Sequence, residues 1–295
     1  MTSTVMASYT GGSDNWGGQY DETAGVLAFE TRYSGQYEVM ENSVQIADIT
    51  ALSEEAQTAI RFLVSKGYLS LDENGLFNPW QPLTRYDFTR TLVSMFFALD
   101  RSLSVSFTDV PEESEYYAYV ASAKANGLVQ GVTEESFAGE QNLSVEQMLT
   151  VTGRTLAERK GYAVPEDAGV YLSVFTDGGA VSEWAREHTA LSVREGLKDR
   201  GGMLEPQGSI TREQAAVALY RLFLRLYEVP PVALDLPPES EEAPDEEKED
   251  GVSESGEEPG NGTVILIASA AGAGVLAGAA AAVIILKKRK TTAGK

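Results

Sequence analysis

The stretch Leu83-Thr84-Arg85-Tyr86-Asp87 decides the fold, because two variants of it follow later in the chain. They are Leu143-Ser144-Val145-Glu146-Gln147 and Ile210-Thr211-Arg212-Glu213-Gln214. Each begins with an apolar residue and a Ser or Thr, and Asp or Gln stands three residues after the hydroxyl. This spacing is typical of a helix N-terminus closed by a capping box, although Asp is unusual at its last position. The predicted structural caps are Thr84, Ser144 and Thr211.

Two further landmarks recur in the same order. One is an aspartate two residues after an apolar residue, at Asp48, Asp109 and Asp177, and the other is a glycine, at Gly67, Gly127 and Gly196. From the first copy to the second, the aspartate, glycine and cap shift by 61, 60 and 60 residues. From the second copy to the third they shift by 68, 69 and 67 residues. Markers that move together indicate a true internal repeat.

Each copy has the pattern of a helix, a loop and a second helix. In the first copy, the apolar face of the first helix ends before Gly67, a residue suited to the left-handed conformation past a helix end. Apolar residues also recur at helical spacing after Thr84 and Thr211. The predicted core positions are Ala56, Ile60, Leu63, Val64, Phe88, Leu92, Met95, Phe96 and Leu99, with Ala215, Leu219, Leu222, Phe223 and Leu226 in the third copy. The chain is therefore predicted to be mainly α.

These residues resemble the S-layer homology (SLH) domain of bacterial surface proteins. The most specific pieces are Leu83–Arg85, Phe107–Val110 and Ile210–Glu213, and Trp184 stands where the family has a tryptophan. The resemblance covers residues 45–228. It implies three repeats, at 45–105, 106–172 and 173–230, of which the second is degenerate. It further implies a pseudo-threefold trimer of helix-loop-helix repeats around a central helical bundle.

The same resemblance implies a function. Grooves of the family bind secondary cell wall polysaccharide, often with pyruvylated sugars, and the arginine after the cap contributes to the site. By resemblance, Arg85 and Arg212 are ligand-binding residues, and the protein is a non-catalytic module that anchors itself at the cell surface. Val145 replaces this arginine in the second copy, where we expect the fold to be retained and binding to be lost.

Physical chemistry singles out the same arginines. A cation at a helix N-terminus opposes the macrodipole, so folding alone does not call for Arg85 or Arg212. A guanidinium beside free backbone N–H groups makes an anion site. The alternative is that both arginines pair with neighbouring carboxylates. On this reasoning an Arg85→Ala/Arg212→Ala variant is predicted to stay folded and to lose wall binding.

Other candidate ligand-binding residues have an equally plain structural interpretation. Trp184 could stack on a sugar ring or belong to the core. Asp48, Asp109 and Asp177 could contact the ligand, but aspartates at such positions more often serve turns and caps. Both interpretations stay open for these four residues.

Composition restricts the function further. The chain has no cysteine and one histidine, His188, so disulfides and thiolate chemistry are excluded, and neither a metal site nor a cofactor is predicted. A net charge of −21 argues against nucleic acid as a partner. We expect no enzyme activity. The alternative functions are an enzyme acting on envelope glycan, for which no acid/base pair or nucleophile stands out, and a structural spacer or protein-binding helical array with vestigial repeats.

The C-terminal fifth of the chain predicts a membrane anchor. Residues 231–262 form an acidic linker, predicted to be disordered, in which 12 Asp or Glu stand beside one Lys between positions 235 and 260. Residues 263–286 carry no charge and are followed by Lys287-Lys288-Arg289-Lys290. This pattern predicts one transmembrane helix at 263–286 and a basic cytoplasmic tail at 287–295. The expected location is the cell surface and cell wall, with a single pass through the lipid bilayer.

The N-terminal region predicts β-structure. Residues 25–31 and 35–40 have strand character on either side of a turn, which indicates a short hairpin. Residues 1–44 are therefore expected to be the end of a truncated β-domain. The same region has no basic and apolar pattern of a secretory signal.

Overall fold

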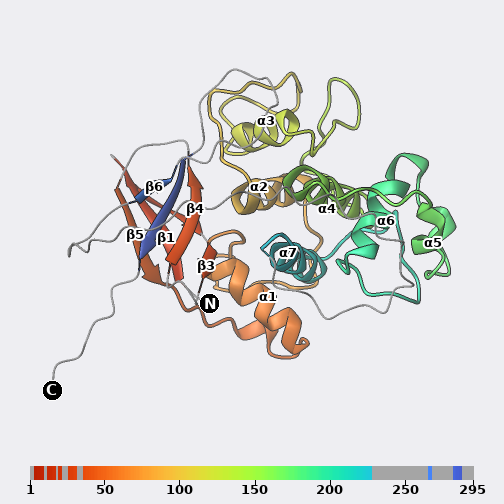
Figure 1. Cartoon of the computed structure of the whole chain (residues 1–295), viewed down its shortest axis with the longest axis horizontal. Helices are drawn as coiled ribbons and strands as arrows, with labels where there is room; N and C mark the ends of the chain where they lie inside the picture. The colour runs from red at the N-terminus through yellow and green to blue at the C-terminus, as the bar shows by residue number, and fades with distance from the viewer. Residues whose placement is uncertain are drawn as a thin grey trace, which may run out of the picture.

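The computed structural model describes the backbone of residues 3–9, 12–17, 19–21, 26–31, 36–227, 265–267 and 282–287, and the side chains within residues 42–227. Within this part the chain is mainly α-helical, as the repeat predicts, and strands lie near both ends of the sequence (Figure 1). The predicted linker at 231–262 lies outside the described residues, as do residues 288–295 of the predicted tail.

The helices follow the three copies, which we call the first, second and third units. The first unit has α1 (Glu54–Ser65) and α2 (Arg85–Phe96), and the second has α3 (Tyr117–Ala125) and α4 (Val145–Lys160). The third unit has α6 (Arg186–Arg194) and α7 (Arg212–Leu226). The short helix α5 (Ala168–Leu172) precedes it, and 3₁₀ turns occupy Ala47–Ile49, Gly178–Ala180 and Glu183–Ala185.

The helix ends are those that the sequence predicts. The hydroxyls of Thr84, Ser144 and Thr211 accept hydrogen bonds from the backbone three residues on, and the full capping box is present in α4 and α7. In α2 the carboxylate of Asp87 instead accepts from the hydroxyls of Thr84 and Tyr116, at 2.9 and 3.0 Å. Three glycines take the left-handed conformation after the first helix of each unit: Gly67, Gly127 and Gly196, with φ of 74°, 69° and 77°. Thus the backbone repeats where the sequence repeats.

The apolar stripes of the helices form one continuous core. All the core positions predicted for α1, α2 and α7 are buried, except Leu99, which is partly buried against the core. At ~25 cal/mol per Å² of apolar surface removed from water, this burial is the main force that holds the helices together.

Each first helix packs on the second helix of the preceding unit. Helix α3 of the second unit packs on α2 of the first, and α6 of the third packs on α4 of the second. The series closes because α1 of the first unit packs on α7 of the third, as Figure 1 shows. The three units therefore form a closed ring in which each unit completes its neighbour.

Backbone hydrogen bonds close the same ring at its centre. The N–H of Leu83 donates to the carbonyl of Ile210 at 3.0 Å, that of Ile210 to Leu143 at 2.9 Å, and that of Leu143 to Leu83 at 2.9 Å. Because these residues directly precede the caps, the ring places the three helix N-termini side by side.

Each helix N-terminus is also joined to the loop of the next unit. The N–H groups of the first two helical residues have no partner inside their own helix. Those of Arg85 and Tyr86 donate to Gln141 and Gly139 of the second unit, at 3.0 and 2.9 Å. The same pair of bonds joins α4 to the third unit and α7 to the first.

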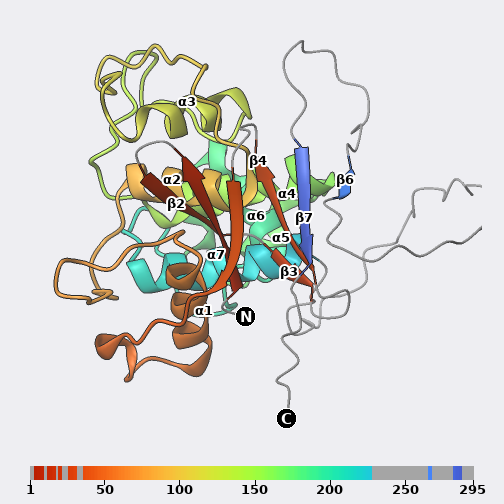
Figure 2. The same ribbon diagram turned by 90° about the vertical axis from the view of Figure 1, so that its left-hand side faces the viewer.

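The strands near the N-terminus correct the predicted hairpin. Strands β4 (Val26–Thr31) and β5 (Gln36–Glu41) lie where the sequence predicts strands, but they do not pair with each other. Strand β5 pairs with β1 (Ser3–Tyr9), whose other neighbour is β2 (Gly12–Gly17). Strand β4 pairs with β3 (Gln19–Asp21) and with β7 (Ala282–Lys287), as Figure 2 shows. Strands β4 and β5 therefore belong to different sheets. A prediction from adjacent segments of the sequence could not show this.

The segment predicted to cross a membrane departs from a helix where it is described. Residues Ile265–Ile267 form β6 and Ala282–Lys287 form β7, which pair with each other, and β7 also pairs with β4. The run Val283-Ile284-Ile285 is β-branched, and such residues favour strands. Among the described residues, no helix has the length and apolar character needed to span a bilayer. The rest of residues 263–286 lies outside the described part.

Candidate functional site

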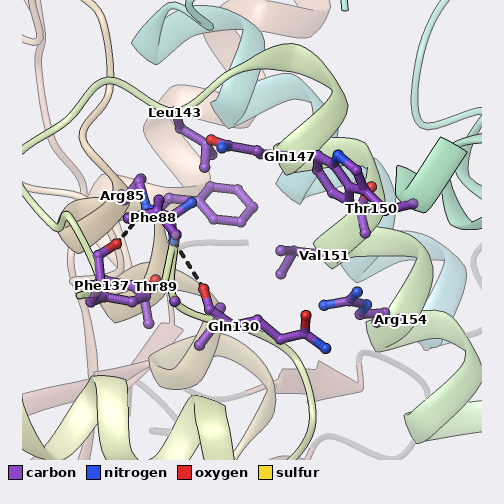
Figure 3. Close-up of a pocket in the computed structure, with 14 residues that line it drawn as sticks. Arg85, Phe88, Thr89, Gln130, Phe137, Leu143, Gln147, Thr150, Val151 and Arg154 are labelled. Atoms are coloured by element: carbon purple, nitrogen blue, oxygen red, sulfur yellow. Dashed lines mark hydrogen bonds between the residues drawn. The ribbon is translucent and has the colours of Figure 1, made fainter. Parts of the chain in front are cut away.

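A groove lies between the first and second units. Its volume is about 390 Å³, and its walls come from α2, from α4 and from the loop at residues 129–132. Figure 3 shows Arg85 and Arg154 on opposite sides of this groove, with Gln130 near both. The third unit contributes Trp184 to the lining. All three units therefore meet at this groove.

Arg85 reaches across the junction from α2 into the second unit. Its Nε donates to the carbonyl of Phe137 at 3.0 Å and its Nη2 to the carbonyl of Gln130 at 3.1 Å. The guanidinium carbon lies 4.7 Å from the ring centroid of Phe137, a cation–π contact. The residue is only 8% exposed. Burial lowers the pKa of Arg85, and the charge of Asp109 acts against this shift.

Arg212 makes the same contacts between the third and first units. Its Nε donates to Phe77 O at 2.8 Å and its Nη2 to Ser70 O at 2.7 Å, and the guanidinium lies 4.6 Å from the Phe77 ring centroid. The premise that folding has no use for these arginines is therefore wrong. Each one satisfies two loop carbonyls of the next unit and packs on its phenylalanine, and these contacts outweigh the unfavourable macrodipole.

Val145 occupies the equivalent position in the second unit and is buried. Its side chain cannot donate to a carbonyl, so this junction keeps the backbone bonds of Val145 and Glu146 without the side-chain link. The prediction that the fold is retained without the arginine agrees with this geometry.

Trp184 stands at the rim of the groove, on the 3₁₀ turn Glu183–Ala185. Its side chain is 54% exposed, while the neighbouring Ala185 is fully buried. The turn is held by Glu146 of α4, whose carboxylate accepts from the backbone N and hydroxyl of Ser182 at 2.9 and 2.8 Å. Trp184 is thus an anchored, partly exposed ring and not a core residue.

Three polar groove residues of α4 were not predicted as site residues from the sequence. Arg154 donates to Leu128 O at 3.2 Å, and burial lowers its pKa. Thr150 is 1% exposed and lines the groove, and its hydroxyl has no hydrogen-bond partner in the described part of the chain. Gln147 closes the capping box of α4 from the same wall. A signal was available for Arg154, because it stands ten residues after its cap, as Arg221 does in the third unit.

The three aspartates hold loops. Asp109 accepts from the backbone N–H groups of Phe137 and Ala138 at 2.8 and 2.7 Å. Asp48 does the same for Phe77 and Asn78 at 3.0 and 2.7 Å, and Asp177 for Leu204 and Glu205 at 2.6 and 2.8 Å. Such contacts are typical of turn residues, which is one of the two interpretations that the sequence left open for these aspartates.

Those aspartates support a strained backbone position. Asn78, Ala138 and Glu205 have φ of 56°, 56° and 54°, and they are the positive-φ residues other than glycine in the described chain. A left-handed residue other than glycine costs ~1 kcal/mol or more, so the aspartate clamp contributes to holding the loop in place.

The described residues offer no group of three or more His, Asp or Glu that could hold a metal ion. His188 is half-buried on α6, and its backbone lies against Gly153 of α4. Burial and the charge of Arg154 lower its pKa, which favours the neutral ring. The groove is lined by guanidinium groups, side-chain amides and an aromatic ring, which can contact an anionic group and a sugar ring.

Comparison with known proteins agrees with the resemblance that the sequence shows to the S-layer homology domain. The S-layer homology domain family matches residues 45–89 and 106–149. The chain is 27% identical over 196 residues to the surface-layer 125 kDa protein of Lysinibacillus sphaericus, which is 65% of this chain and 16% of that protein. It is 23% identical over 208 residues to an amylopullulanase of Thermoanaerobacterium thermosulfurigenes, which is 70% of this chain and 11% of that enzyme. The chain therefore spans a small fraction of the length of either relative.

The two matched segments contain the aspartate, glycine and cap landmarks of the first two units. S-layer homology domains are non-catalytic modules that anchor proteins to the cell wall. The chain is an S-layer homology domain protein, with two repeats of that family at residues 45–89 and 106–149.

Proposed function

We propose that this chain is a non-catalytic anchor that binds an anionic secondary cell wall polysaccharide, with pyruvylated sugars as the best fit, in the groove between the first and second units. One observation carries the proposal. The lining of this groove contains Arg85 and Arg154 and no Asp or Glu, in a protein with a net charge of −21. Charges farther than ~8 Å are largely screened in physiological salt, so the two arginines dominate the field that a ligand meets there.

The third unit acts as a third S-layer homology repeat in this proposal, at residues 173–230. Its cap, glycine and aspartate make the same contacts as those of the first two units. Its Trp184 supplies an aromatic face on which a sugar ring can stack.

Binding to cell-wall sacculi of the producing bacterium tests the function. The full chain is mixed with sacculi that carry their polymer and with sacculi from which the polymer has been extracted, and the sedimented fraction is measured. The chain is expected to sediment with the first and to stay in the supernatant with the second. Equal binding to both preparations would contradict the proposal.

The groove is tested by variants that avoid the structural arginines. Trp184→Ala and Arg154→Gln are each expected to weaken binding by about tenfold or more, because each removes a direct ligand contact. The matched controls are Trp80→Ala, a tryptophan that is 70% exposed outside the groove, and Arg61→Gln, an exposed arginine of α1. Loss of binding in the controls, with binding intact in the groove variants, would exclude this groove as the site.

The second candidate function is a structural spacer or protein-binding helical array. The close packing of all three units is equally compatible with it. Such a protein would ignore wall polymer and bind another surface protein saturably, which surface plasmon resonance on wall extracts would detect.

We also propose that residues 263–286 tether the protein to the lipid bilayer. Support comes from the 24 uncharged residues and the basic cluster that follows. Insertion into the bilayer requires β6 and β7 to leave the sheet that they form with β4. Expression of the full chain in a Gram-positive host, followed by carbonate extraction of membranes, tests this tether. Release of the chain into the carbonate supernatant would refute it.

A further inference from the structure

The three junctions between units place equivalent residues in equivalent positions. Trp184, Glu115 and Glu55 each stand twelve residues before the glycine that ends the first helix of a unit, at Gly196, Gly127 and Gly67. Each reaches over the junction formed by the other two units. Trp184 of the third unit lies at the junction of the first and second, which we call junction 1–2.

Junction 2–3, between the second and third units, is closed by an ion-pair network. Arg221 of α7 stands where α4 has Arg154, and both donate to a carbonyl at the end of a first helix, Gly196 O at 3.5 Å and Leu128 O at 3.2 Å. Unlike Arg154, Arg221 bonds both oxygens of Glu55, each at 2.7 Å, and lies 2.8 Å from Asp199. Hydrogen bonding to Glu55 raises the pKa of Arg221 above its ordinary value. The cavity here is smaller, about 240 Å³.

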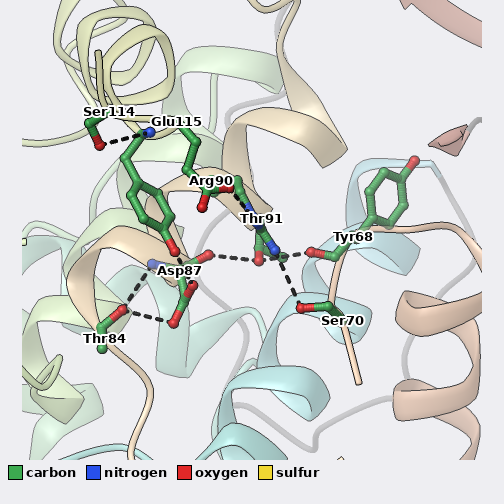
Figure 4. Close-up of polar contacts among 9 residues, drawn as sticks. Tyr68, Ser70, Thr84, Asp87, Arg90, Thr91, Ser114 and Glu115 are labelled. Carbon is green, nitrogen blue, oxygen red and sulfur yellow. Dashed lines mark hydrogen bonds and ion pairs between the residues drawn. The ribbon is translucent and has the colours of Figure 1, made fainter. Parts of the chain in front are cut away.

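Junction 3–1, between the third and first units, also carries an ion pair, although it is a single contact and the Glu115 side chain is 70% exposed. Arg90 of α2 lies 3.3 Å from Glu115, the counterpart of Trp184, and Figure 4 shows this pair beside Asp87. Nearby carboxylates, Asp87 foremost, also favour the charged form of Arg212 there, although burial lowers its pKa overall. An anionic ligand would have to compete with these carboxylates.

Junction 1–2 is different because a tryptophan replaces the acidic residue. Arg154 has no ion pair in the described part of the chain, and the carbonyl of Leu128 satisfies only one of its nitrogens. The buried hydroxyl of Thr150 on the same wall also has no partner. A guanidinium that lines a groove without an ion pair in the described part of the chain, beside an exposed tryptophan ring, is a feature expected of a site whose partner is a ligand.

We propose that junction 1–2 is the single glycan site of the three, that Trp184 keeps it open, and that Glu55 and Glu115 act as internal occupants that close the other two junctions. This inference rests on the proposed function and specifies it. The site takes one anionic group between the two arginines and one sugar ring against Trp184. At the other two junctions, a carboxylate of the protein itself pairs with an arginine that an anionic ligand would otherwise contact.

Three arginine variants separate the junctions. Arg154→Gln at junction 1–2 is expected to weaken binding to polymer-bearing sacculi by about tenfold or more. Arg221→Gln at junction 2–3 and Arg90→Gln at junction 3–1 are expected to stay within about twofold, since their charges are already matched internally. Thermal melting of each variant, compared with the unmodified chain, checks that the fold is intact. Equal losses in all three variants would overturn the inference.

An exchange at the position of Trp184 tests the closing mechanism directly. Trp184→Gln removes the ring, and Trp184→Glu also adds the carboxylate found in the other two units. The Glu variant is expected to bind about tenfold more weakly than the Gln variant, because the new carboxylate would pair with Arg154. Equal affinities of the two variants would overturn the closing role of this position.

Stoichiometry gives an independent measurement. Isothermal titration of the full chain with polymer fragments released from the same sacculi is expected to give one fragment for each chain. Two or three fragments for each chain would refute the single site but leave wall binding standing. Failure of the unmodified chain to bind sacculi or fragments would instead refute the proposed function itself.

Discussion

Arg85 of the first unit lies over the ring of Phe137 of the second, 4.7 Å from its centroid, and donates to that residue's own carbonyl at 3.0 Å. One side chain therefore holds both the ring and the backbone of the neighbouring loop. Arg212 and Phe77 repeat this relationship between the third and first units. The arginine after the cap is thus first a fastener between units, and Arg85 also faces the groove.

Removing these arginines is expected to destabilise the fold. Arg85→Ala leaves the carbonyls of Phe137 and Gln130 without their donor, and an unsatisfied buried group costs about 1–3 kcal/mol. The free energy of unfolding, measured in urea, should fall by that amount, and Arg212→Ala should behave alike. The exposed Arg61→Ala serves as a control. An Arg85→Ala/Arg212→Ala variant with unchanged stability would show that the inter-unit bonds contribute nothing.

Acid should weaken the loop clamps. Partial burial tends to raise the pKa of Asp109, but hydrogen bonds from Phe137 and Ala138 prevail and hold it below 3.8. The pKa of Asp177 is also lowered, chiefly by the hydrogen bond from Leu204. A carboxylate with a depressed folded pKa stabilises the fold above its unfolded pKa of about 4, and this contribution is lost as pH falls through the folded pKa.

Urea unfolding between pH 6 and pH 2.5 measures this loss. Stability should decline below about pH 4, and Asp109→Asn and Asp177→Asn should each flatten the decline, because the replaced group no longer titrates. A pH profile identical in the variants and the unmodified chain would contradict the role assigned to these carboxylates.

Ala138→Gly is expected to stabilise the protein. Ala138 has φ of 56°, and glycine adopts this conformation without the steric cost of ~1 kcal/mol that alanine meets. The same replacement at Ala157, inside α4, should destabilise by about 1 kcal/mol or more, because glycine there loses helix propensity and the methyl group that packs against the core. Thermal melting of the two variants should therefore move in opposite directions, and a shared direction would refute the strain at Ala138.

Gly153→Ala is expected to destabilise the protein although alanine is the better helix former. A Cβ at Gly153 would lie 2.3 Å from the carbonyl oxygen of His188, a backbone atom that cannot yield. Overpacking of this kind costs about 1–3 kcal/mol, more than the ~1 kcal/mol gained in helix propensity. A rise in melting temperature would show that α6 can move away from α4.

The sequence predicts what depends on neighbours along the chain. Caps, αL glycines and buried stripes follow from local spacing, and the structure has them at Thr84, Gly67 and Leu92. The sequence could not predict which units pack against each other, because α1 packs on α7, which lies far along the chain. The partners of Arg85 and Arg154 are loop carbonyls of this kind.

For the same reason, only part of the candidate site could be predicted from the sequence. Trp184 and Arg85 stand out by their types and positions in the repeat, but they belong to units that are not consecutive. Only the closed packing brings them to one groove. The sequence shows that Trp184 stands where the other two units have Glu55 and Glu115. Its consequence becomes clear only in the structure, which shows the arginines that the two glutamates contact.

The mutual hydrogen bonds of Leu83, Leu143 and Ile210 have a consequence for how such a domain can evolve or be cut. A linear stack of repeats can lose its last member and keep the remainder folded. Here every member has two neighbours, so deletion of any one exposes two surfaces, and a fourth member has no place to join. The order of the units along the chain is, by contrast, free to rotate, so a circular permutant that starts at the second or third unit retains the same set of contacts.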